Sequence, residues 1–392
     1  MQSRGDSAMG GGPLLGTRIV DLTDERGIFG AKLLGDLGAD VVRPEPPGGD
    51  PLRRRGPHLH GDGASLWYAF FATSRRFLTT DLGRDADRAR LQQLVERADV
   101  LLTCPGAFAI DHVDVVAARR ANPRLVHVDV SSFGDDGPWR DFQAPDLVAG
   151  ALGGCVGTTG APDTTPLKTF GELNFMVSGI YAAIAALAGR RYARASGEGQ
   201  RVSVPVHECL VTCLEHVLMF YWYGESMRRG RVLPRQGGTH WSMAYTVMPA
   251  QNGAIMVTPA PQIDAQLTWL VEEDAHGDLL DEKYADPANA PLLIARMMQL
   301  MREWVAKQDA EELFYRAQAR HSPYGWVQPI ERLADNPQLA TREWWSTLDV
   351  GGRELRAPGA PFEFSETPCA PRDSTHLSAE VMLSELGWEN PR

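Results

Sequence analysis

Between Thr17 and Ser132, short apolar runs alternate with helix-like segments such as GAKLLGDLG from Gly30, DADRARLQQLVERA from Asp85 and VDVVAARRAN from Val113. This βαβ alternation predicts an α/β fold, with a Rossmann-like, largely parallel sheet and helices on both faces. The β-rich runs are TRIVDL from Thr17, ADVV from Ala39, RFLTTDL from Arg76, DVLLTC from Asp99 and LVHVDV from Leu125.

After Phe133 the alternation gives way to a passage rich in glycine and proline. Residues 175–188 are then apolar on every side, which predicts a helix buried within the domain. A further strand, QRVSVPV from Gln200, and an apolar helix around Leu210 to Tyr223 complete the first unit.

From about Gly230 the pattern changes. The runs AYTVMPA and GAIMVTPA flank Asn252-Gly253, a pair that suits tight hairpin turns. Helical stretches follow near Leu267, over 293–306 and over 310–319. The sequence therefore predicts a flexible tail over 1–13, a large α/β domain over 14–225 plus 330–392, and a smaller α+β domain over 226–329.

The composition narrows the classes of function. A length of 392 residues exceeds one typical hydrophobic core. A net charge of -11 argues against a nucleic-acid-binding surface, although a local basic pocket can still hold a phosphorylated ligand. Five irregularly spaced cysteines do not form a disulfide framework, which favours a reducing compartment, the cytoplasm. The sequence shows neither a membrane-length apolar stretch nor the apolar core of a signal peptide.

The run LLGDLGADVVRPEPPGGDPLR, residues 33–53, resembles a signature of the family III CoA-transferases. This is the formyl-CoA and carnitine CoA-transferase type, in a superfamily that also holds the α-methylacyl-CoA racemases. Other blocks agree with the family in order and spacing. They are Arg75-Arg76 before TTDL, ADVLLTCPG from Ala98, NPRLVHVDVSSFGDDGP from Asn122, SGEGQRVSVPVHE from Ser196 and YGWVQPIERLADNPQLATRE from Tyr324.

The resemblance implies a large domain built from the N-terminal half plus the C-terminal tail, with a small domain between them. It also implies a homodimer of two chains interlocked as linked rings. The implied activity moves CoA between an acyl-CoA thioester and a carboxylic acid, without a metal or a redox cofactor.

Such transfer needs a carboxylate nucleophile that attacks the thioester and then carries CoA itself. The family places an Asp after a Gly shortly before the buried helix, and the matching residues are Gly171 and Glu172. The Glu side chain is one methylene longer than Asp, and a misplacement of about 1 Å can cost about 100-fold in rate. The pattern alone favours an ordinary acidic residue at a helix N-terminus, where the macrodipole favours negative charge. The family register favours Glu172 as the nucleophile.

Asp146 falls where the family has a second acidic residue in the active site. The alternative is a helix cap before LVAGAL. The racemase branch has a His just before this acid, whereas this chain has Pro145, which cannot act as a base. His127 nearby keeps a racemase or isomerase as a third hypothesis.

The turn after the first strand, Thr23–Gly27, lies at the carboxyl end of the sheet, where open α/β folds bind ligands. Arg26 there is a candidate for a CoA phosphate or a substrate carboxylate, and a surface Asp24–Arg26 pair is the alternative. Further arginines are candidates for the CoA phosphates, although charge runs are more often solvated faces. The candidate CoA-binding residues are Arg26, Gly27, Arg43, Arg53, Arg75, Arg76, Thr80, Asp81, Cys104, Pro105 and Gln143, with Arg54 and Arg55 beside Arg53.

Gly237 and Gly238 match a glycine-rich loop that in relatives closes over the acyl intermediate, and an ordinary turn is the alternative. No metal site is expected, because His207, Glu208 and His216 lack the H-E-x-x-H spacing. The sequence also lacks a Gly-x-Gly-x-x-Gly fingerprint, a P-loop and a Gly-x-Ser-x-Gly elbow.

The leading hypothesis is therefore a CoA-transferase that uses Glu172. Its first alternative is a non-catalytic or partner-dependent acyl-CoA-binding protein, motivated by Glu in place of Asp and by the unusual Asp24 and Arg26. The sequence does not name the acyl group.

Overall fold

The computed structural model describes residues 11–61, 63–226, 235–239, 244–259, 263–378, 383 and 385–388. The chain divides into two compact units. The first falls within Met1–Cys155, Lys168–His216 and Gln338–Arg392, and the second within Val156–Leu167 and Val217–Pro337. Compared with the predicted domains, this division moves 156–167, 217–225 and 330–337 into the second unit.

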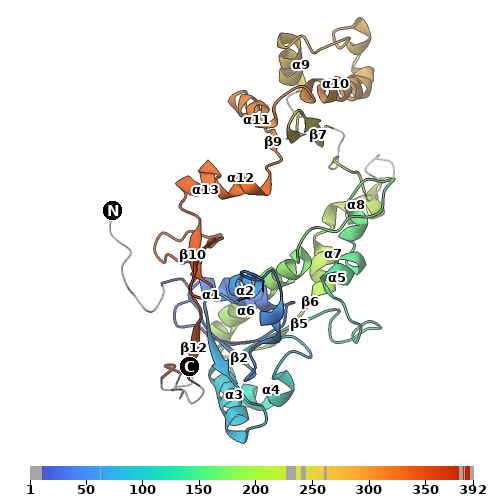
Figure 1. Cartoon of the computed structure of the whole chain (residues 1–392). Coiled ribbons are helices and arrows are strands. Elements are labelled where there is room, and N and C mark those ends of the chain that lie inside the picture. The colour runs from blue at the N-terminus through green and yellow to red at the C-terminus, as the bar shows by residue number, and fades with distance from the viewer. Residues whose placement is uncertain are drawn as a thin grey trace. The chain divides into compact units, whose positions relative to one another are not determined.

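A seven-stranded parallel sheet forms the centre of the first unit, in the order β12-β3-β2-β1-β4-β5-β6 (Figure 1). Each predicted strand of the N-terminal half is present, and β12 from the C-terminal segment extends the sheet beside β3. The strands are β1 (Arg18–Leu22), β2 (Asp40–Glu45), β3 (Arg75–Thr79), β4 (Val100–Thr103), β5 (Val126–Ser131), β6 (Arg201–Pro205) and β12 (Thr375–Leu377).

Helices cover both faces of this sheet, as the βαβ pattern predicts. Leu34 of α1 and Ala186 of α6 pack on one face with Val126 and Val128. Leu94 of α3 and Ala118 of α4 pack on the other. The helices are α1 (Ile28–Asp36), α2 (Leu66–Phe71), α3 (Asp85–Arg97), α4 (Val115–Ala121), α5 (Asp146–Leu152), α6 (Leu173–Ser196), α7 (Val206–Thr212) and α13 (Pro337–Thr341), and a small hairpin of β10 (Ser346–Asp349) and β11 (Glu354–Ala357) completes the unit.

The second unit combines a small antiparallel sheet with helices, an α+β arrangement. The Asn252-Gly253 turn joins β7 to β8, as predicted. The elements are β7 (Thr246–Ala250), β8 (Gly253–Val257), β9 (Gly325–Trp326), α9 (Ile263–Glu272), α10 (Ala290–Val305), α11 (Ala310–Ala319) and α12 (Ile330–Ala334), with α8 (Glu215–Tyr223) at the boundary of the two units.

Two predictions about helices are wrong. The single helix expected around Leu210 to Tyr223 is two helices, because Cys213 and Leu214 donate their amides three residues back and end α7. The helix expected to be buried on every side, α6, exposes Ile180, Ile184 and Leu187 at helical spacing. Among the described residues, α6 is the one helix whose length and composition would suit a membrane span, yet its other face packs in the core of the first unit.

α6 approaches α1 closely because both helices have glycine at the crossing. A Cβ atom on Gly30 would lie 2.6 Å from the carbonyl oxygen of Gly179. The hydroxyl of Ser178 also donates to the carbonyl of Arg26 at 2.8 Å. These contacts hold the N-terminal end of α6 beside the loop that follows β1.

Candidate active site

The strand order reverses at β1, which has β2 on one side and β4 on the other. Open parallel sheets bind ligands in the crevice at the carboxyl ends of strands at such a switch point. A cavity of about 200 Å³ lies there, and its walls come from the loops after β1, β2 and β4. Its lining includes Thr23, Asp24, Glu25, Gly106 and Phe108.

Arg26 joins two of these loops. Its Nε donates to Asp24 Oδ1 at 3.0 Å, and its Nη2 donates to the carbonyl oxygen of Pro105 at 2.7 Å. Gly27 is tightly packed, because a Cβ atom there would lie 2.7 Å from Thr23 Cγ2 and 3.3 Å from Cys104 Sγ. Arg26 therefore fixes the shape of the crevice, and its guanidinium already holds an acidic partner.

Glu172 is the residue immediately before α6. Its Oε1 accepts a hydrogen bond from Arg55 Nη2, and its Oε2 accepts one from Trp67 Nε1 at 3.0 Å. The Arg55 guanidinium also lies 4.6 Å from the centre of the Trp67 ring and 3.5 Å from Glu25 Oε1. Glu25 lines the crevice, so Arg55 connects Glu172 to the switch point.

Burial raises the pKa of Glu172 above its usual value, and the neighbouring Asp146 and Glu25 act in the same direction. The Arg55 charge and the Trp67 hydrogen bond oppose this shift but do not cancel it. Glu172 is therefore easier to protonate than an ordinary surface glutamate.

Asp146 is buried and caps α6, not the helix that it begins. Its Oδ1 accepts the backbone N–H of Phe175 at 3.1 Å, and its Oδ2 accepts from Asn174 Nδ2 at 2.9 Å. The sequence-based alternative of a cap before LVAGAL is wrong in detail, because α5 has no side-chain cap and Pro145 precedes it. Asp146 holds the first turn of α6 and thereby the backbone next to Glu172.

The family model of CoA-transferase family III matches residues 14–375. The chain belongs to CoA-transferase family III. It is a CoA-transferase, an enzyme that moves CoA between an acyl-CoA thioester and a carboxylic acid.

Known proteins similar to this CoA-transferase span nearly its whole length. Succinyl-CoA:(R)-benzylsuccinate CoA-transferase subunit BbsE of Thauera aromatica is 31% identical and aligns over 95% of this chain and 93% of its own. Formyl-CoA:oxalate CoA-transferase of Streptomyces avermitilis is 30% identical over 95% of both chains. The crystal structure of a CAIB/BAIF family protein from Brucella suis superposes with a TM-score of 0.79 at 23% identity, covering 97% of this chain and 100% of the other, which shows the shared fold.

Two arginines expected at the CoA phosphates are instead buried inside the CoA-transferase sheet. Arg43 Nε donates to Asp50 Oδ2 at 2.8 Å, and Arg75 Nε donates to Asp21 Oδ2 at 2.9 Å. Both guanidinium groups are at least 95% buried at the side chain. Their charge is matched within the protein, and Arg43 also lines the switch-point crevice. Their contacts with CoA stay predictions.

The other predicted CoA-binding residues have varied surroundings. Arg53 Nε donates to Glu45 Oε2 at 2.8 Å, and Arg76 pairs with Asp40. Burial raises the pKa of the Cys104 thiol well above its usual value, so this residue stays protonated. The hydroxyl of Thr80 is bonded to the carbonyl of Leu78, Asp81 accepts the amide of Gly83, and Gln143 is exposed. Their contacts with CoA stay predictions.

Gly237 and Gly238 belong to the second unit. Gly237 has a φ of 60° and donates its amide to Gly160 at 3.0 Å, while the carbonyl of Gly238 accepts the amide of Val247 at 2.8 Å. This turn is compatible with a lid, and that role stays a prediction. Among the described residues, no group of three His, Cys, Asp or Glu side chains is arranged to hold a metal ion.

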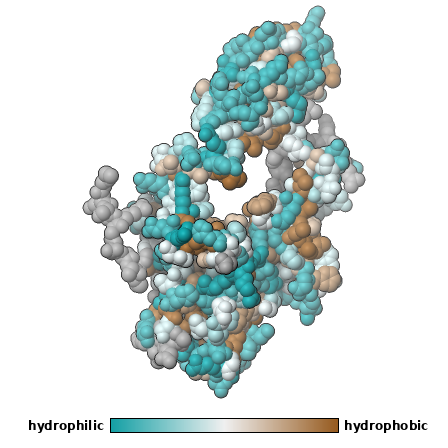
Figure 2. Space-filling view, viewed as in Figure 1, coloured by the Kyte–Doolittle hydropathy of each residue, from teal (hydrophilic) through white to brown (hydrophobic). Residues whose placement is uncertain are grey.

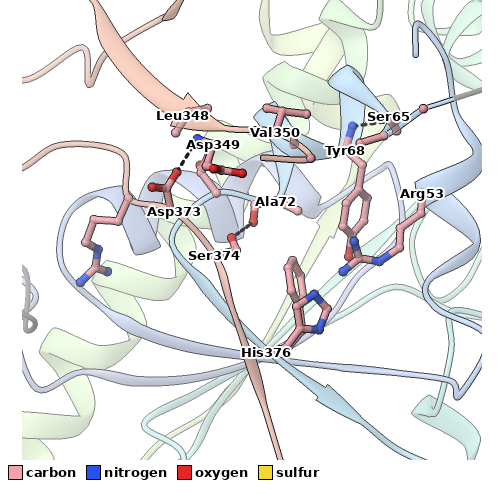
Figure 3. Close-up of a pocket in the computed structure, with 17 residues that line it drawn as sticks. Arg53, Ser65, Tyr68, Ala72, Leu348, Asp349, Val350, Asp373, Ser374 and His376 are labelled. Carbon is pink, nitrogen blue, oxygen red and sulfur yellow. Dashed lines mark hydrogen bonds between the residues drawn. The ribbon is translucent and has the colours of Figure 1, made fainter. Parts of the chain in front are cut away.

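A second cavity, of about 330 Å³, lies beside α2 in the first unit (Figure 3). Arg53, Tyr68 and His376 come together on one side, and Asp349 and Asp373 lie on the other. Much of this lining comes from the C-terminal segment, which the sequence assigns to the large domain without predicting a cavity there. The sequence does not predict the contact of Trp67 with Glu172, because the two residues are far apart along the chain and no local pattern links them. Arg55, in contrast, belongs to the arginine run Arg53–Arg55 that the sequence marks as a candidate.

Proposed function

We propose that Glu172 is the nucleophile with which this CoA-transferase works. The observation that carries the proposal is the placement of Glu172, which lies half-buried beside the switch-point crevice between two hydrogen-bond donors. This chain has a Glu where the family resemblance implies an Asp, and Arg55 and Trp67 hold the longer side chain.

The proposed reaction has two halves. CoA passes first to Glu172 and then to the acceptor acid, and the free energy of the thioester bond is kept in both. The Glu172 carboxylate attacks the thioester carbon, the carbon–sulfur bond breaks, and CoA leaves as a thiolate. The thiolate then attacks the Glu172 carbon of the resulting anhydride and releases the donor acid. A glutamyl-CoA thioester remains. The acceptor acid repeats both steps in reverse order and regenerates the Glu172 carboxylate. No step exchanges electrons with a cofactor, so we propose that neither a metal nor a redox group takes part.

Arg55 and Trp67 have a chemical task in this scheme. Attack on the Glu172 carbonyl carbon places negative charge on the glutamyl oxygen that did not attack the thioester, and a donor already aimed at that oxygen stabilises it without reorganisation. Arg55 donates to Oε1 and Trp67 donates to Oε2. One of the two therefore serves the oxyanion, while the other releases the oxygen that attacks.

We further propose that at least one of the acids is a dicarboxylate. The relatives are named for transfer involving benzylsuccinate and succinate, oxalate or mesaconate, all dicarboxylates. The test is to incubate the protein with succinyl-CoA, formyl-CoA or acetyl-CoA together with each acid and to measure new CoA esters by mass spectrometry. Transfer confined to pairs containing a dicarboxylate supports the proposal, and efficient transfer between two monocarboxylates contradicts it.

Two observations favour a second candidate, a partner-dependent subunit. Both Glu172 oxygens already hold donors, and one relative is named as a subunit of its transferase. This candidate predicts that the chain alone gains thermal stability from acyl-CoA by mass action but transfers no CoA. Turnover by the isolated chain rejects it.

We propose a cytoplasmic homodimer of interlocked chains as the working assembly. The exposed stripe of Ile180, Ile184 and Leu187 on α6 supports a protein contact there, because large apolar patches mark interaction sites. Apolar side chains are also exposed on α5, at Leu147, Val148 and Leu152 (Figure 2). Cys104 and Cys209 are buried free thiols, in keeping with a reducing compartment.

Replacement of Glu172 by aspartate is expected to lower kcat by about 100-fold, because the shorter carboxylate moves away from Arg55 and Trp67 by about 1 Å. The measurement is steady-state transfer with the best donor and acceptor pair, with KM for the acyl-CoA unchanged within a few-fold. A faster Glu172→Asp enzyme would mean that the pocket is still shaped for aspartate.

A further inference from the structure

The loop that leads into α6 holds a lysine that the sequence does not mark as a candidate. Lys168 lies four residues before Glu172, and its side chain is partly exposed. Its ammonium donates to the carbonyl oxygen of Gly171 and lies 3.6 Å from Asp146 Oδ2. Lys168 therefore contacts both the residue that precedes Glu172 and the residue that caps α6.

The contact with Gly171 acts on the backbone of Glu172. The carbonyl of Gly171 and the amide of Glu172 belong to one planar peptide unit, so a hydrogen bond to the carbonyl also orients the amide. Gly171 has a φ of 77°, in the left-handed region that glycine adopts most easily. The carbonyl of Glu172 in turn accepts the amide of Met176 at 3.0 Å. The backbone of Glu172 is thus held on both sides, and Lys168 supplies the contact on the amino-terminal side.

The contact with Asp146 acts on the charge near Glu172. Charged groups face Glu172 from several elements, with Arg55 in the segment after β2, Glu25 after β1 and Asp146 at the start of α5. Burial is the main cause of the raised pKa of Glu172, while Arg55 lowers it and Asp146 and Glu25 raise it further. The Lys168 ammonium offsets the charge of Asp146, because opposite charges that lie close together largely cancel at a distance.

We propose that Lys168 is a positioning residue for CoA transfer, which orients the Glu172 backbone and keeps the Glu172 carboxylate ionised by balancing the charge of Asp146. This inference rests on the proposed role of Glu172 as the nucleophile. Only the ionised carboxylate attacks the thioester. Without the Lys168 charge, the unbalanced Asp146 makes Glu172 keep its proton to a higher pH, and the peptide unit before Glu172 loses its side-chain contact.

The experiment compares wild type with Lys168→Met, which removes the charge and keeps much of the length of the side chain. The acid limb of kcat/KM for the acyl-CoA donor is expected to move to higher pH by about half a pH unit or more. At pH 7.5, kcat is expected to fall by about tenfold, because Glu172 is less well oriented, with KM for acyl-CoA unchanged within about threefold. The ionisations of the substrates are common to both proteins, so the difference between the two pH profiles reports the enzyme.

Two further variants separate positioning from a merely structural contact. Lys168→Arg keeps the positive charge and is expected to restore the wild-type acid limb. Lys307→Met removes an exposed lysine of the second unit and is the matched control, with the pH profile and kcat of wild type. A loss of kcat in Lys168→Met with an unmoved acid limb marks a structural contact and overturns the proposal. An acid limb that Lys168→Arg does not restore, or that moves equally in Lys307→Met, also overturns it.

Glu172→Gln, measured beside these variants, tells a failure of this inference from a failure of the proposed function. If Glu172→Gln is inactive while Lys168→Met keeps the wild-type kcat and pH profile, Glu172 stands as the nucleophile and only the role of Lys168 is rejected. If Glu172→Gln keeps full activity, the proposed nucleophile is rejected, and the role of Lys168 falls with it.

Discussion

Replacement of Glu172 by glutamine is expected to lower kcat for CoA transfer by at least about 1000-fold, the scale of loss when an enzyme loses its nucleophile. Glutamine keeps the shape of the side chain, and its amide oxygen can still accept from Arg55 or Trp67. The affinity for acyl-CoA should therefore change by no more than a few-fold. Steady-state transfer assays and thermal shifts with acyl-CoA separate these two effects.

The matched control is Glu198→Gln, which removes an exposed carboxylate just beyond the other end of α6. It should leave both kcat and acyl-CoA binding unchanged. Full activity in Glu172→Gln would move the nucleophile elsewhere. Asp146 would become the next residue to test, although its carboxylate is occupied by the first turn of α6.

Replacement of Asp21 by asparagine is expected to lower the free energy of unfolding by about 3–5 kcal/mol, because it leaves buried positive charge without its partner. Asp21 is fully buried. Its Oδ2 lies 2.9 Å from Arg75 Nε and 3.0 Å from Arg43 Nη1, and its Oδ1 accepts from the Thr23 hydroxyl at 2.6 Å. Urea unfolding at pH 7 measures the loss, with the exposed Asp141→Asn as the control.

The difference in stability between wild type and Asp21→Asn has a defined pH dependence. Burial alone would raise the pKa of Asp21, but Arg43 and Arg75 outweigh it, so the pKa in the folded state lies below its usual value. A lowered folded-state pKa means that the stabilisation is complete above the unfolded-state pKa of about 3.9 and is lost as pH falls through the folded-state value. The stability difference between wild type and Asp21→Asn should therefore be constant from pH 7 to about 5 and shrink only in stronger acid. A difference that vanished by pH 6 would contradict this assignment.

Local patterns in the sequence predicted most of the first unit. The strands from Thr17 to Leu125 are short, β-branched and separated by helices, so periodicity alone located them. The position of Glu172 before α6 followed from the family register. In contrast, the role of Asp146 was missed, because it caps a helix that begins 27 residues later in the chain, at Leu173.

The sequence did not predict contacts between residues far apart along the chain or the exposure of apolar side chains. Arg43 and Arg75 are candidates for the CoA phosphates in the sequence because an arginine there gives no sign of a buried acidic partner, and Asp21 lies on a different strand from both. The exposed stripe on α6 was expected to be buried, because an apolar helix looks the same whether it is covered by its own domain or left open. Trp67 contacts Glu172 only in the folded chain, because 105 residues separate the two in the sequence.

The most direct test of the central claim is to trap the enzyme-bound intermediate. The protein is incubated with an active acyl-CoA donor without acceptor acid, treated with hydroxylamine, and digested for mass spectrometry. The account predicts a hydroxamate on Glu172 that depends on acyl-CoA and is absent in Glu172→Gln. A hydroxamate on another carboxylate, or none from an enzyme that is turning over, would contradict it.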